Sequence, residues 1–270
     1  MTQLLKSSAI VVLIVSSLTC CKNSNKENSE RAMPKTQQWI KLLNNTDLSD
    51  WIIKIKGHPS GKNYKNTFVL ENNILKVNYV AYDSFNNTFG HIFYKKPFSN
   101  YKFRMDYRFT GEQLPDGAAW AKRNSGIMIH SEDPHKMGLE QHFPVSIEVQ
   151  LLGGNGTNER TTANLCTPGT NVVMNDSLIT AHCTSSSSKT FHGEQWVNIE
   201  IEVRNDSIIK HFINGEEVMR YSKPQYGGGN IDFNLDYWKS KSGSPLKSGY
   251  IALQSESHPV EFKNIEIMEL

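Results

Sequence analysis

The segment YKFRMDYRF, residues 101–109, decides the fold class of this chain. Apolar side chains occupy every second position of the segment, and charged side chains occupy the positions between them. Because successive side chains of a strand point to opposite faces, this period of two predicts a strand with one buried face and one face in water. The segments VNIEIEVR (197–204) and VEFKNIEIMEL (260–270) repeat the pattern.

Shorter segments of strand composition follow one another through the rest of the chain. They read NTFVL (66–70), ILKVNYV (74–80), FGHIFY (89–94), SGIMIH (125–130), IIKHFI (208–213) and GYIALQS (249–255). Turn residues separate them, at Glu71-Asn72-Asn73, Asn205-Asp206, Asn214-Gly215 and Gly227–Gly229. The sequence therefore predicts an all-β, single-domain fold over residues 39–270, a two-sheet antiparallel β-sandwich of the jelly-roll type.

No stretch of the chain sustains the apolar stripe of a helix. IDFNLDYW (231–238) offers three polar side chains on alternate positions, like the start of a calcium loop, but Tyr237 stands where that loop requires glycine. We therefore expect this segment to form a polar strand face. Residues 111–125 and 153–190 lack a clear period and are expected to be long irregular loops, which in compact domains are often functional.

Composition excludes one large class of partner. The chain has 270 residues, 29 Lys and Arg against 27 Asp and Glu, and a formal charge of +2. With no basic block either, the electrostatic footprint of a nucleic-acid-binding protein is missing.

The N-terminal residues read as a targeting segment. Lys6 precedes the apolar run 9–18, which is too short to span a membrane and suits a signal peptide. A Cys pair and a polar tether follow, as in bacterial lipoproteins. We expect a signal peptide over 1–20, a tether over 21–38, and a lipid on Cys20 or Cys21 that anchors the exported protein in the cell envelope, in the periplasm or at the outer membrane. Plain secretion is the alternative.

Export determines how Cys166 and Cys183 are interpreted. Both lie in turn-rich sequence, 17 positions apart, and neither belongs to a CxxC motif that would favour a metal. Two such cysteines in an oxidising compartment are expected to form a disulfide. Closing a loop of this size contributes about 3 kcal/mol in the chain-entropy account.

Candidate site residues come from FPVSIEVQLLGG, residues 143–154. If Ile147 and Val149 pack between the sheets, then Glu148 and Gln150 project from the opposite face. The same reasoning applied to SGIMIH predicts that His130 points outward. The side chains of Trp120, Arg123 and Asn124 would reach the same face from the adjoining loop. These residues would line a carbohydrate groove. The alternative is that they only solvate an exposed face.

The strand lacks the pattern of ordinary glucan hydrolysis. Laminarinase-type sandwich enzymes carry Glu-x-Asp-x-x-Glu, whose two glutamates serve as nucleophile and acid. Here the strand reads Glu148-Val-Gln150-Leu-Leu-Gly153, so one carboxylate remains. Two-carboxylate hydrolysis is therefore not expected from this strand.

Four segments resemble one known family. NSGIMIHSEDP, FPVSIEVQLLGG, SGYIALQSESHPVEFKNIEIMEL and the opening WIKLLNNTDLSDW are similar to segments of the 3-keto-disaccharide hydrolases, and they come in the order expected of that family. The resemblance covers essentially residues 39–270. It implies a concanavalin A-like jelly roll, a secreted or lipid-anchored bacterial protein, and glycoside or oligosaccharide substrates already oxidised to a ketone at C3. The inserted Cys-containing segment departs from the shortest members of the family.

This implied chemistry suits a site with one carboxylate. A C3 ketone acidifies the C2 proton, a base removes it, and the enolate expels the C1 substituent, with or without later addition of water. The reaction needs a base, an acid and a group that stabilises the enolate. Glu148 and His130 are the candidates for base and acid. Gln150, Asn124, Arg123 or a divalent cation would stabilise the enolate; the metal ligands are left unassigned.

Two other functions remain open at this stage. A non-catalytic carbohydrate-binding module can use the same fold, because fold does not determine function. A structural envelope lipoprotein would bind no sugar at all. The histidines at 130, 135 and 142 lack the spacing of a metal motif and are interpreted as a surface cluster.

Overall fold

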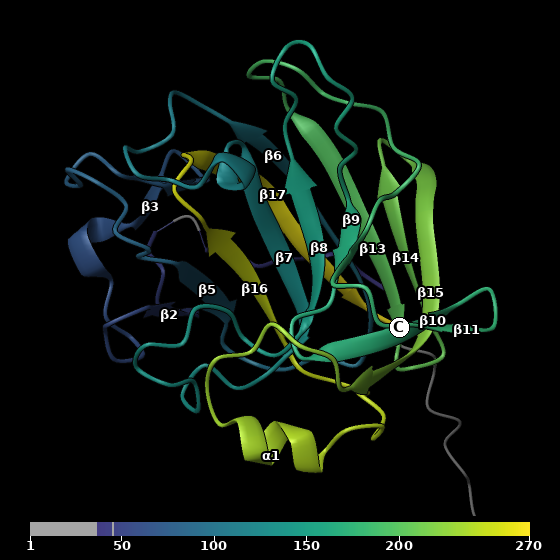
Figure 1. Cartoon of the computed structure of the whole chain (residues 1–270). Coiled ribbons are helices and arrows are strands. Elements are labelled where there is room, and N and C mark those ends of the chain that lie inside the picture. The colour runs from purple at the N-terminus through teal and green to yellow at the C-terminus, as the bar shows by residue number, and fades with distance from the viewer. Residues whose placement is uncertain (1–36, 45) are drawn as a thin grey trace, which may run out of the picture. The chain divides into compact units, whose positions relative to one another are not determined.

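Two antiparallel sheets stack face to face in the computed structural model of the chain, which describes residues 37–44 and 46–270 (Figure 1). The larger sheet has ten strands in the order β11-β10-β15-β14-β13-β6-β17-β4-β3, with β1 also paired to β17. The smaller sheet has seven strands in the order β12-β9-β8-β7-β16-β5-β2. The predicted two-sheet β-sandwich is therefore confirmed.

Strand bounds follow the alternating segments closely. The ten-stranded sheet consists of β1 (Ile40–Lys41), β3 (Phe68–Glu71), β4 (Ile74–Val77), β6 (Asn100–Phe109), β10 (Thr170–Met174), β11 (Ser177–Ile179), β13 (Val197–Arg204), β14 (Ile208–Ile213), β15 (Glu216–Tyr226) and β17 (Val260–Glu269). The seven-stranded sheet consists of β2 (Trp51–Ile55), β5 (Gly90–Tyr94), β7 (Asn124–Ser131), β8 (Ile147–Leu152), β9 (Asn164–Cys166), β12 (Cys183–Thr184) and β16 (Tyr250–Ser255).

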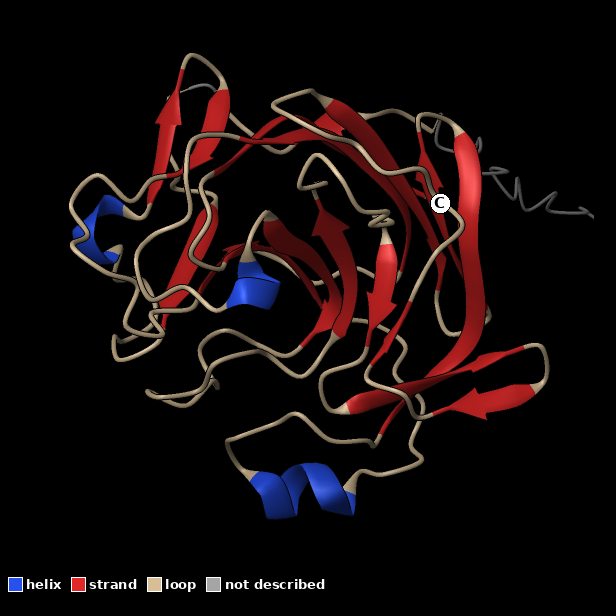
Figure 2. Ribbon diagram, turned by 45° about the horizontal axis from the view of Figure 1, so that its top comes forward, coloured by secondary structure: helices blue, strands red, loops and turns tan. Residues whose placement is uncertain are grey.

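The helices among the described residues are short (Figure 2). They are the 3-10 turns η1 (Tyr64–Asn66) and η2 (Ala119–Ala121) and the helix α1 (Leu235–Ser240). Among the residues that the structure describes, no helix has the length and apolar content needed to cross a membrane.

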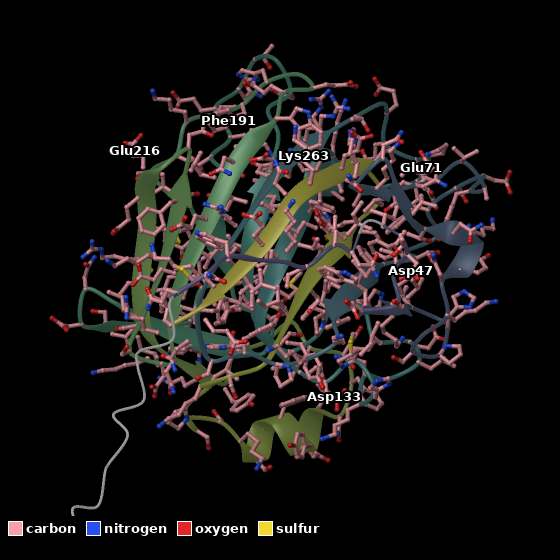
Figure 3. The ribbon with its side chains drawn as sticks, turned by 180° about the vertical axis from the view of Figure 1, so that it is seen from behind. Asp47, Glu71, Asp133, Phe191, Glu216 and Lys263 are labelled. Carbon is pink, nitrogen blue, oxygen red and sulfur yellow. A yellow bond between two sulfur atoms is a disulfide. The ribbon has the colours of Figure 1, made fainter. Side chains whose placement is uncertain are left out.

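The core lies between the sheets and comes from the apolar positions of the alternating strands. Tyr101, Phe103 and Met105 of β6 are fully buried there together with Ile147 and Val149 of β8. Fully burying one such side chain stabilises the fold by roughly 1.5–3 kcal/mol. The positions between them point outward on both sheets, so each sheet has an outer face. Figure 3 shows the outer face of the ten-stranded sheet, where Lys263 projects from β17.

Two predicted turns connect neighbouring strands tightly. Asn214 and Gly215 join β14 to β15 with φ of 49° and 84°, and Asn72 and Asn73 join β3 to β4 with φ of 51° and 62°. Positive φ at both central residues matches the right-handed twist of a hairpin and is tolerated by Asn and Gly. These two predictions are confirmed.

Two sequence-based expectations about structure are wrong. The segment 153–190 is not a long irregular loop, because it contains the short strands β9 to β12. IDFNLDYW does not form a strand face: its second half belongs to the helix α1, and its first half is an irregular connection. Strands of two to five residues are too short to show a period, and their partners lie far away in the sequence.

The predictions for the N-terminus concern residues that the structure does not describe. The signal peptide over 1–20, the lipid on Cys20 or Cys21 and almost all of the tether over 21–38 lie outside the described residues.

Candidate active site

Strand β8 places Glu148 and Gln150 on the outer face of the seven-stranded sheet. Ile147, Val149 and Leu151 are buried in the core, so the alternation predicted from the sequence is confirmed. Glu148 and Gln150 open into a cavity of about 400 Å³, which we call the Glu148 pocket. Its lining consists of Trp120, Asn124, Phe143, Glu148, Gln150, Cys166, Pro168, His182, Cys183, Asn230 and Glu256.

Room for the Glu148 carboxylate is made by a glycine on the neighbouring strand. Gly126 of β7 is the Cα partner of Gln150, and the side chain of Glu148 lies over it. A Cβ atom at Gly126 would lie 2.6 Å from Oε1 of Glu148, which is closer than atoms can approach. The absence of a side chain at this position therefore leaves the space that the carboxylate occupies.

Glu256 brings a second carboxylate into the pocket. It follows β16 directly, is 2% exposed, and its Oε2 has no hydrogen-bond partner among the described residues. Sequence reasoning missed it, because it considered the carboxylates of one strand only. Glu256 reaches Glu148 because β16 pairs with β7, and β7 pairs with β8. The expectation of a one-carboxylate site is therefore corrected.

The two carboxylates hold protons more tightly than ordinary glutamates. Burial raises the pKa of Glu148, and burial raises the pKa of Glu256 well above its usual value. The charge of Glu148 raises the pKa of Glu256 further, while the Arg160 guanidinium partly opposes this. Since two negative charges in one low-dielectric cavity repel, the pair retains a proton near neutral pH and can present one acid and one base.

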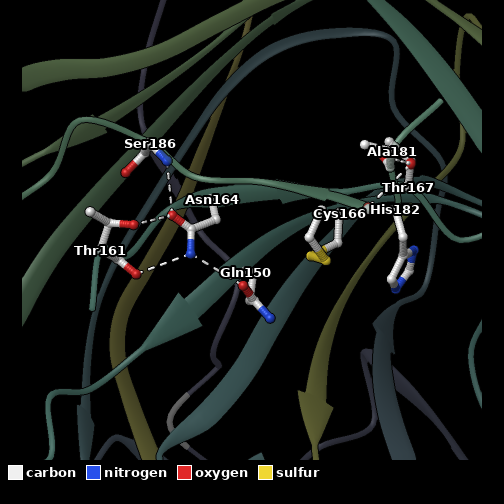
Figure 4. Close-up of a disulfide and its surroundings, with 9 residues drawn as sticks. Gln150, Thr161, Asn164, Cys166, Thr167, Ala181, His182 and Ser186 are labelled. Atoms are coloured by element: carbon white, nitrogen blue, oxygen red, sulfur yellow. Dashed lines mark hydrogen bonds between the residues drawn. A yellow bond between two sulfur atoms is a disulfide. The ribbon is translucent and has the colours of Figure 1, made fainter. Parts of the chain in front are cut away.

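Gln150 is oriented as a hydrogen-bond donor to the pocket. Its Oε1 accepts a hydrogen bond from Nδ2 of Asn164 at 3.2 Å (Figure 4). Asn164 is itself held by the backbone N–H of Ser186 and the hydroxyl of Thr161, which both donate to its Oδ1. With its oxygen occupied, the Gln150 amide offers its N–H groups to a ligand.

The predicted disulfide is confirmed and forms part of the pocket wall. Cys166 and Cys183 are bonded and pair in register across β9 and β12 (Figure 4). Cys166 is also the Cα partner of Glu148. The inserted segment therefore extends the seven-stranded sheet and closes one side of the site.

Trp120 and Asn124 line the pocket as expected, and Arg123 does not. The Trp120 ring is stacked with Phe89 at 6.4 Å between centroids and remains 55% exposed. Arg123 turns away, and its guanidinium donates to the carbonyl of Gly193 at 2.8 Å. The cation near the carboxylates is Arg160, which also donates to the carbonyl of Trp120 at 3.0 Å.

His130 is not beside Glu148, so its expected placement is wrong. The residue has a φ of +48°, and the pairing between β7 and β16 shifts register at this point. Its Nε2 makes a hydrogen bond of 3.0 Å with the carbonyl of Asn205, in the turn between β13 and β14. The prediction assumed regular alternation, and a left-handed residue breaks that alternation.

Two buried polar side chains that the sequence did not signal lie in the same sheet as the pocket residues. His91 of β5 and Gln254 of β16 are Cα partners on the outer face of the seven-stranded sheet. Neither ring nitrogen of His91 and neither amide atom of Gln254 has a partner among the described residues. Burial lowers the pKa of His91 to about 3, so the ring is neutral. Unsatisfied groups of this kind are rare outside sites that bind water or ligand.

The pocket lining contains two carboxylates, those of Glu148 and Glu256, and one imidazole, that of His182. Across residues 37–44 and 46–270, no group of three or more His, Cys, Asp or Glu side chains is arranged to hold a metal ion. His142 pairs instead with Asp232, and His130 bonds to backbone. As arranged in the described residues, these donors do not fit a metal centre.

Comparison with known proteins identifies the domain. The family model described as the 3-keto-alpha-glucoside-1,2-lyase-like domain matches residues 38–268. No curated protein matches the sequence.

Solved structures share the fold at low sequence identity. Two crystal structures from Parabacteroides distasonis, both provisionally described as glycosyl hydrolases, are similar with TM-scores of 0.50. One is 16% identical over 87% of this chain and 100% of that chain, and the other is 18% identical over 86% and 94%. A carbohydrate-binding module from Bacillus subtilis is 9% identical over 82% and 96%, with a TM-score of 0.46.

Proposed function

The chain belongs to the 3-keto-alpha-glucoside-1,2-lyase-like domain family, and from this membership we propose that it cleaves the glycosidic bond of 3-keto-glycosides, including 3-keto-disaccharides. A carbohydrate-related function follows from the family. The single observation that carries the specific reaction is the pair of buried carboxylates, Glu148 and Glu256, in one cavity.

The reaction needs both a base and an acid. The base removes the proton on C2, which the neighbouring C3 ketone acidifies, and the electrons form an enolate. The enolate collapses with cleavage of the C1–O bond, and the leaving oxygen takes a proton from the acid. The products are an unsaturated 3-keto sugar and the released alcohol; addition of water to C1 would complete a net hydrolysis.

Glu148 acts as the base and Glu256 as the acid. The repulsion between the two carboxyls is mutual, so the pair shares one proton. We assign Glu148 as the base because it lies on the same face of β8 as Gln150, the side chain that would stabilise the enolate. Each turnover moves one proton from C2 to Glu148 and one from Glu256 to the leaving group. Transfer of a proton between the two carboxyls then restores the starting state.

Gln150 stabilises the enolate. Its oxygen is engaged by Asn164, so its N–H groups are available to the negative C3 oxygen. A preorganised donor of this kind, in a site that excludes water, commonly contributes about 10²–10³ in rate. Asn124, which also lines the pocket, binds substrate hydroxyls.

Turnover of p-nitrophenyl 3-keto-glucosides, in both anomeric forms, tests the proposal through release of p-nitrophenol. We expect Glu148→Gln and Glu256→Gln to lower kcat by roughly 10²–10⁴. The matched control is Glu200→Gln, which changes a partly exposed carboxylate of β13 that pairs with Lys102. Full activity in Glu148→Gln would contradict the assigned base. Binding of unoxidised oligosaccharide without turnover of any 3-keto compound would identify a carbohydrate-binding module instead.

We also propose that the protein is exported and lipid-anchored through Cys20 or Cys21, on the strength of the apolar run 9–18 and the Cys pair that follows. Detergent phase partition of the protein from its host tests this. Replacement of the lipidated Cys by Ser should move the protein to the aqueous phase, and replacement of the other should not. Partition of the unaltered protein into the aqueous phase would contradict the anchor.

A further inference from the structure

We propose that a second cavity binds a sugar residue of an oligosaccharide whose reacting residue occupies the Glu148 pocket, an inference that rests on the proposed function. This cavity measures about 640 Å³ and lies where β7 ends and β16 begins, beside α1. We call it the aromatic pocket. Its lining includes Glu132, Tyr226, Phe233, Tyr237, Trp238 and Tyr250.

Aromatic rings make up much of its wall. The rings of Tyr226 and Trp238 are stacked with 5.6 Å between centroids, and Tyr237 meets Trp238 edge to face at 4.8 Å. Phe233 is 40% exposed and Tyr237 is 47% exposed. Amphipathic rings in contact with solvent suit a ligand that has apolar C–H faces and polar edges, as a pyranose has.

Polar groups of fixed position accompany the rings. Oε1 of Glu132 accepts hydrogen bonds from the backbone N–H of Val145 at 2.7 Å and from Nε2 of Gln141 at 2.6 Å. The indole N–H of Trp238 has no partner among the described residues. An anchored carboxylate beside aromatic faces, with an unpaired buried indole N–H behind them, is a set of groups that can orient sugar hydroxyls.

A third cavity of about 400 Å³ shares one wall residue with the aromatic pocket and another with the Glu148 pocket. Trp238 lines both the aromatic pocket and this cavity, and Asn230 lines both this cavity and the Glu148 pocket. All three cavities therefore share walls built by the connection between β15 and β16. A glycan chain is the ligand that repeats one chemical unit along such a row.

That connection is fastened to the rest of the site. His142 pairs with Asp232, and Phe233 packs directly against Gly138. Phe143, next to His142, lines the Glu148 pocket. Residues 138–143 therefore contact the wall of the aromatic pocket and also line the Glu148 pocket. An oligosaccharide bound across the cavities would contact surfaces whose relative positions are fixed.

Calorimetric binding of maltohexaose, cellohexaose and laminarihexaose to the full chain tests the inference. We expect at least one to bind, with affinity lowered about tenfold in Trp238→Ala and in Tyr237→Ala. Tyr237 is exposed, so its replacement leaves the fold intact. The matched control is Trp196→Ala, whose ring lies under Arg108 and Lys263 on the outer face of the ten-stranded sheet.

The outcomes separate this inference from the proposed function. Binding that falls in the two α1 variants and not in the control supports the aromatic pocket. Absence of binding by all three glucans, or equal affinity in all variants, overturns it. Cleavage of p-nitrophenyl 3-keto-glucoside, too short to reach α1, should be equal in all variants; failure of that cleavage rejects the proposed function without changing the binding result.

Discussion

The two outer faces of the sandwich differ in whether their carboxylates are paired with cations. On the ten-stranded sheet, cations and carboxylates of neighbouring strands are paired: Lys102 with Glu200 at 3.0 Å, Arg104 with Glu266 at 2.7 Å, and Arg108 with Glu261 at 2.7 Å. On the seven-stranded sheet, Glu148 and Glu256 are buried, and neither forms an ion pair within the described part of the chain.

This difference distinguishes a face whose charges suit contact with water from the face that carries the two carboxylates of the proposed reaction. Partly exposed pairs on a strand surface contribute about 0–1 kcal/mol each. A buried carboxylate without a cationic partner destabilises the fold, and its pKa rises. Proteins retain such groups mainly where their shifted pKa is used. The buried carboxylates of the seven-stranded face therefore lower the stability of the fold, whereas the ion pairs of the ten-stranded face do not.

Apart from replacement of the two carboxylates themselves, the largest effect is expected from adding one methyl group beneath the base. In Gly126→Ala, the new Cβ would lie 2.6 Å from Oε1 of Glu148 and displace the carboxylate. We expect kcat on a 3-keto-glucoside to fall roughly 10²-fold or more, because a misplaced base loses its contribution. Unchanged kcat, with folding verified by circular dichroism, would contradict the site geometry.

Removal of the disulfide should weaken the edge of the seven-stranded sheet. The Cys166→Ser/Cys183→Ser double variant reopens a 17-residue separation, which corresponds to about 3 kcal/mol of unfolding free energy. Denaturant titration measures the loss, and KM should rise because both residues line the pocket. Stability equal to that of the unaltered chain under oxidising conditions would show that this edge is held by its β pairing alone.

The pH dependence of stability should also distinguish the two faces. Burial raises the pKa of Glu148 above 4.5, so the folded state binds a proton that the unfolded state releases. This stabilising contribution is complete below pH 4.5 and is lost as pH rises toward the folded pKa. A pKa that is one pH unit higher in the folded than in the unfolded state corresponds to about 1.4 kcal/mol.

Glu148→Gln should therefore be at least about 1.4 kcal/mol more stable than the unaltered chain near neutral pH, and no more stable in acid. Denaturant titrations across this pH range provide the measurement. An equal slope with pH in both proteins would mean that Glu148 is ionised at its ordinary pKa.

The smallest effect belongs to the ten-stranded face. Glu200→Gln removes one partner of Lys102, whose side chain is 28% exposed. We expect less than about 1 kcal/mol of lost stability, reduced further by salt, and no change in kcat. A change of several kcal/mol would show that the ion pairs of this face form a cooperative network.

Much of the fold was predictable because strand alternation is a local property. The faces of β6, β8, β13 and β17 follow directly from residue order, as do the hairpin turns at Asn72-Asn73 and Asn214-Gly215. Glu148 and Gln150 were found for the same reason. The short strands β9 to β12 were missed, since a few residues cannot display a period.

The sequence by itself determined the sandwich, its buried positions, the Cys166–Cys183 pairing and the outward direction of Glu148. Only the tertiary structure decided which groups meet Glu148. Glu256 lies in the same pocket as Glu148 because β16 lies next to β7, which in turn pairs with β8. His130 does not lie there, because its own left-handed backbone conformation interrupts the alternation of β7. Strand order and local breaks in pairing depend on contacts between distant segments, and no periodicity within one strand contains that information.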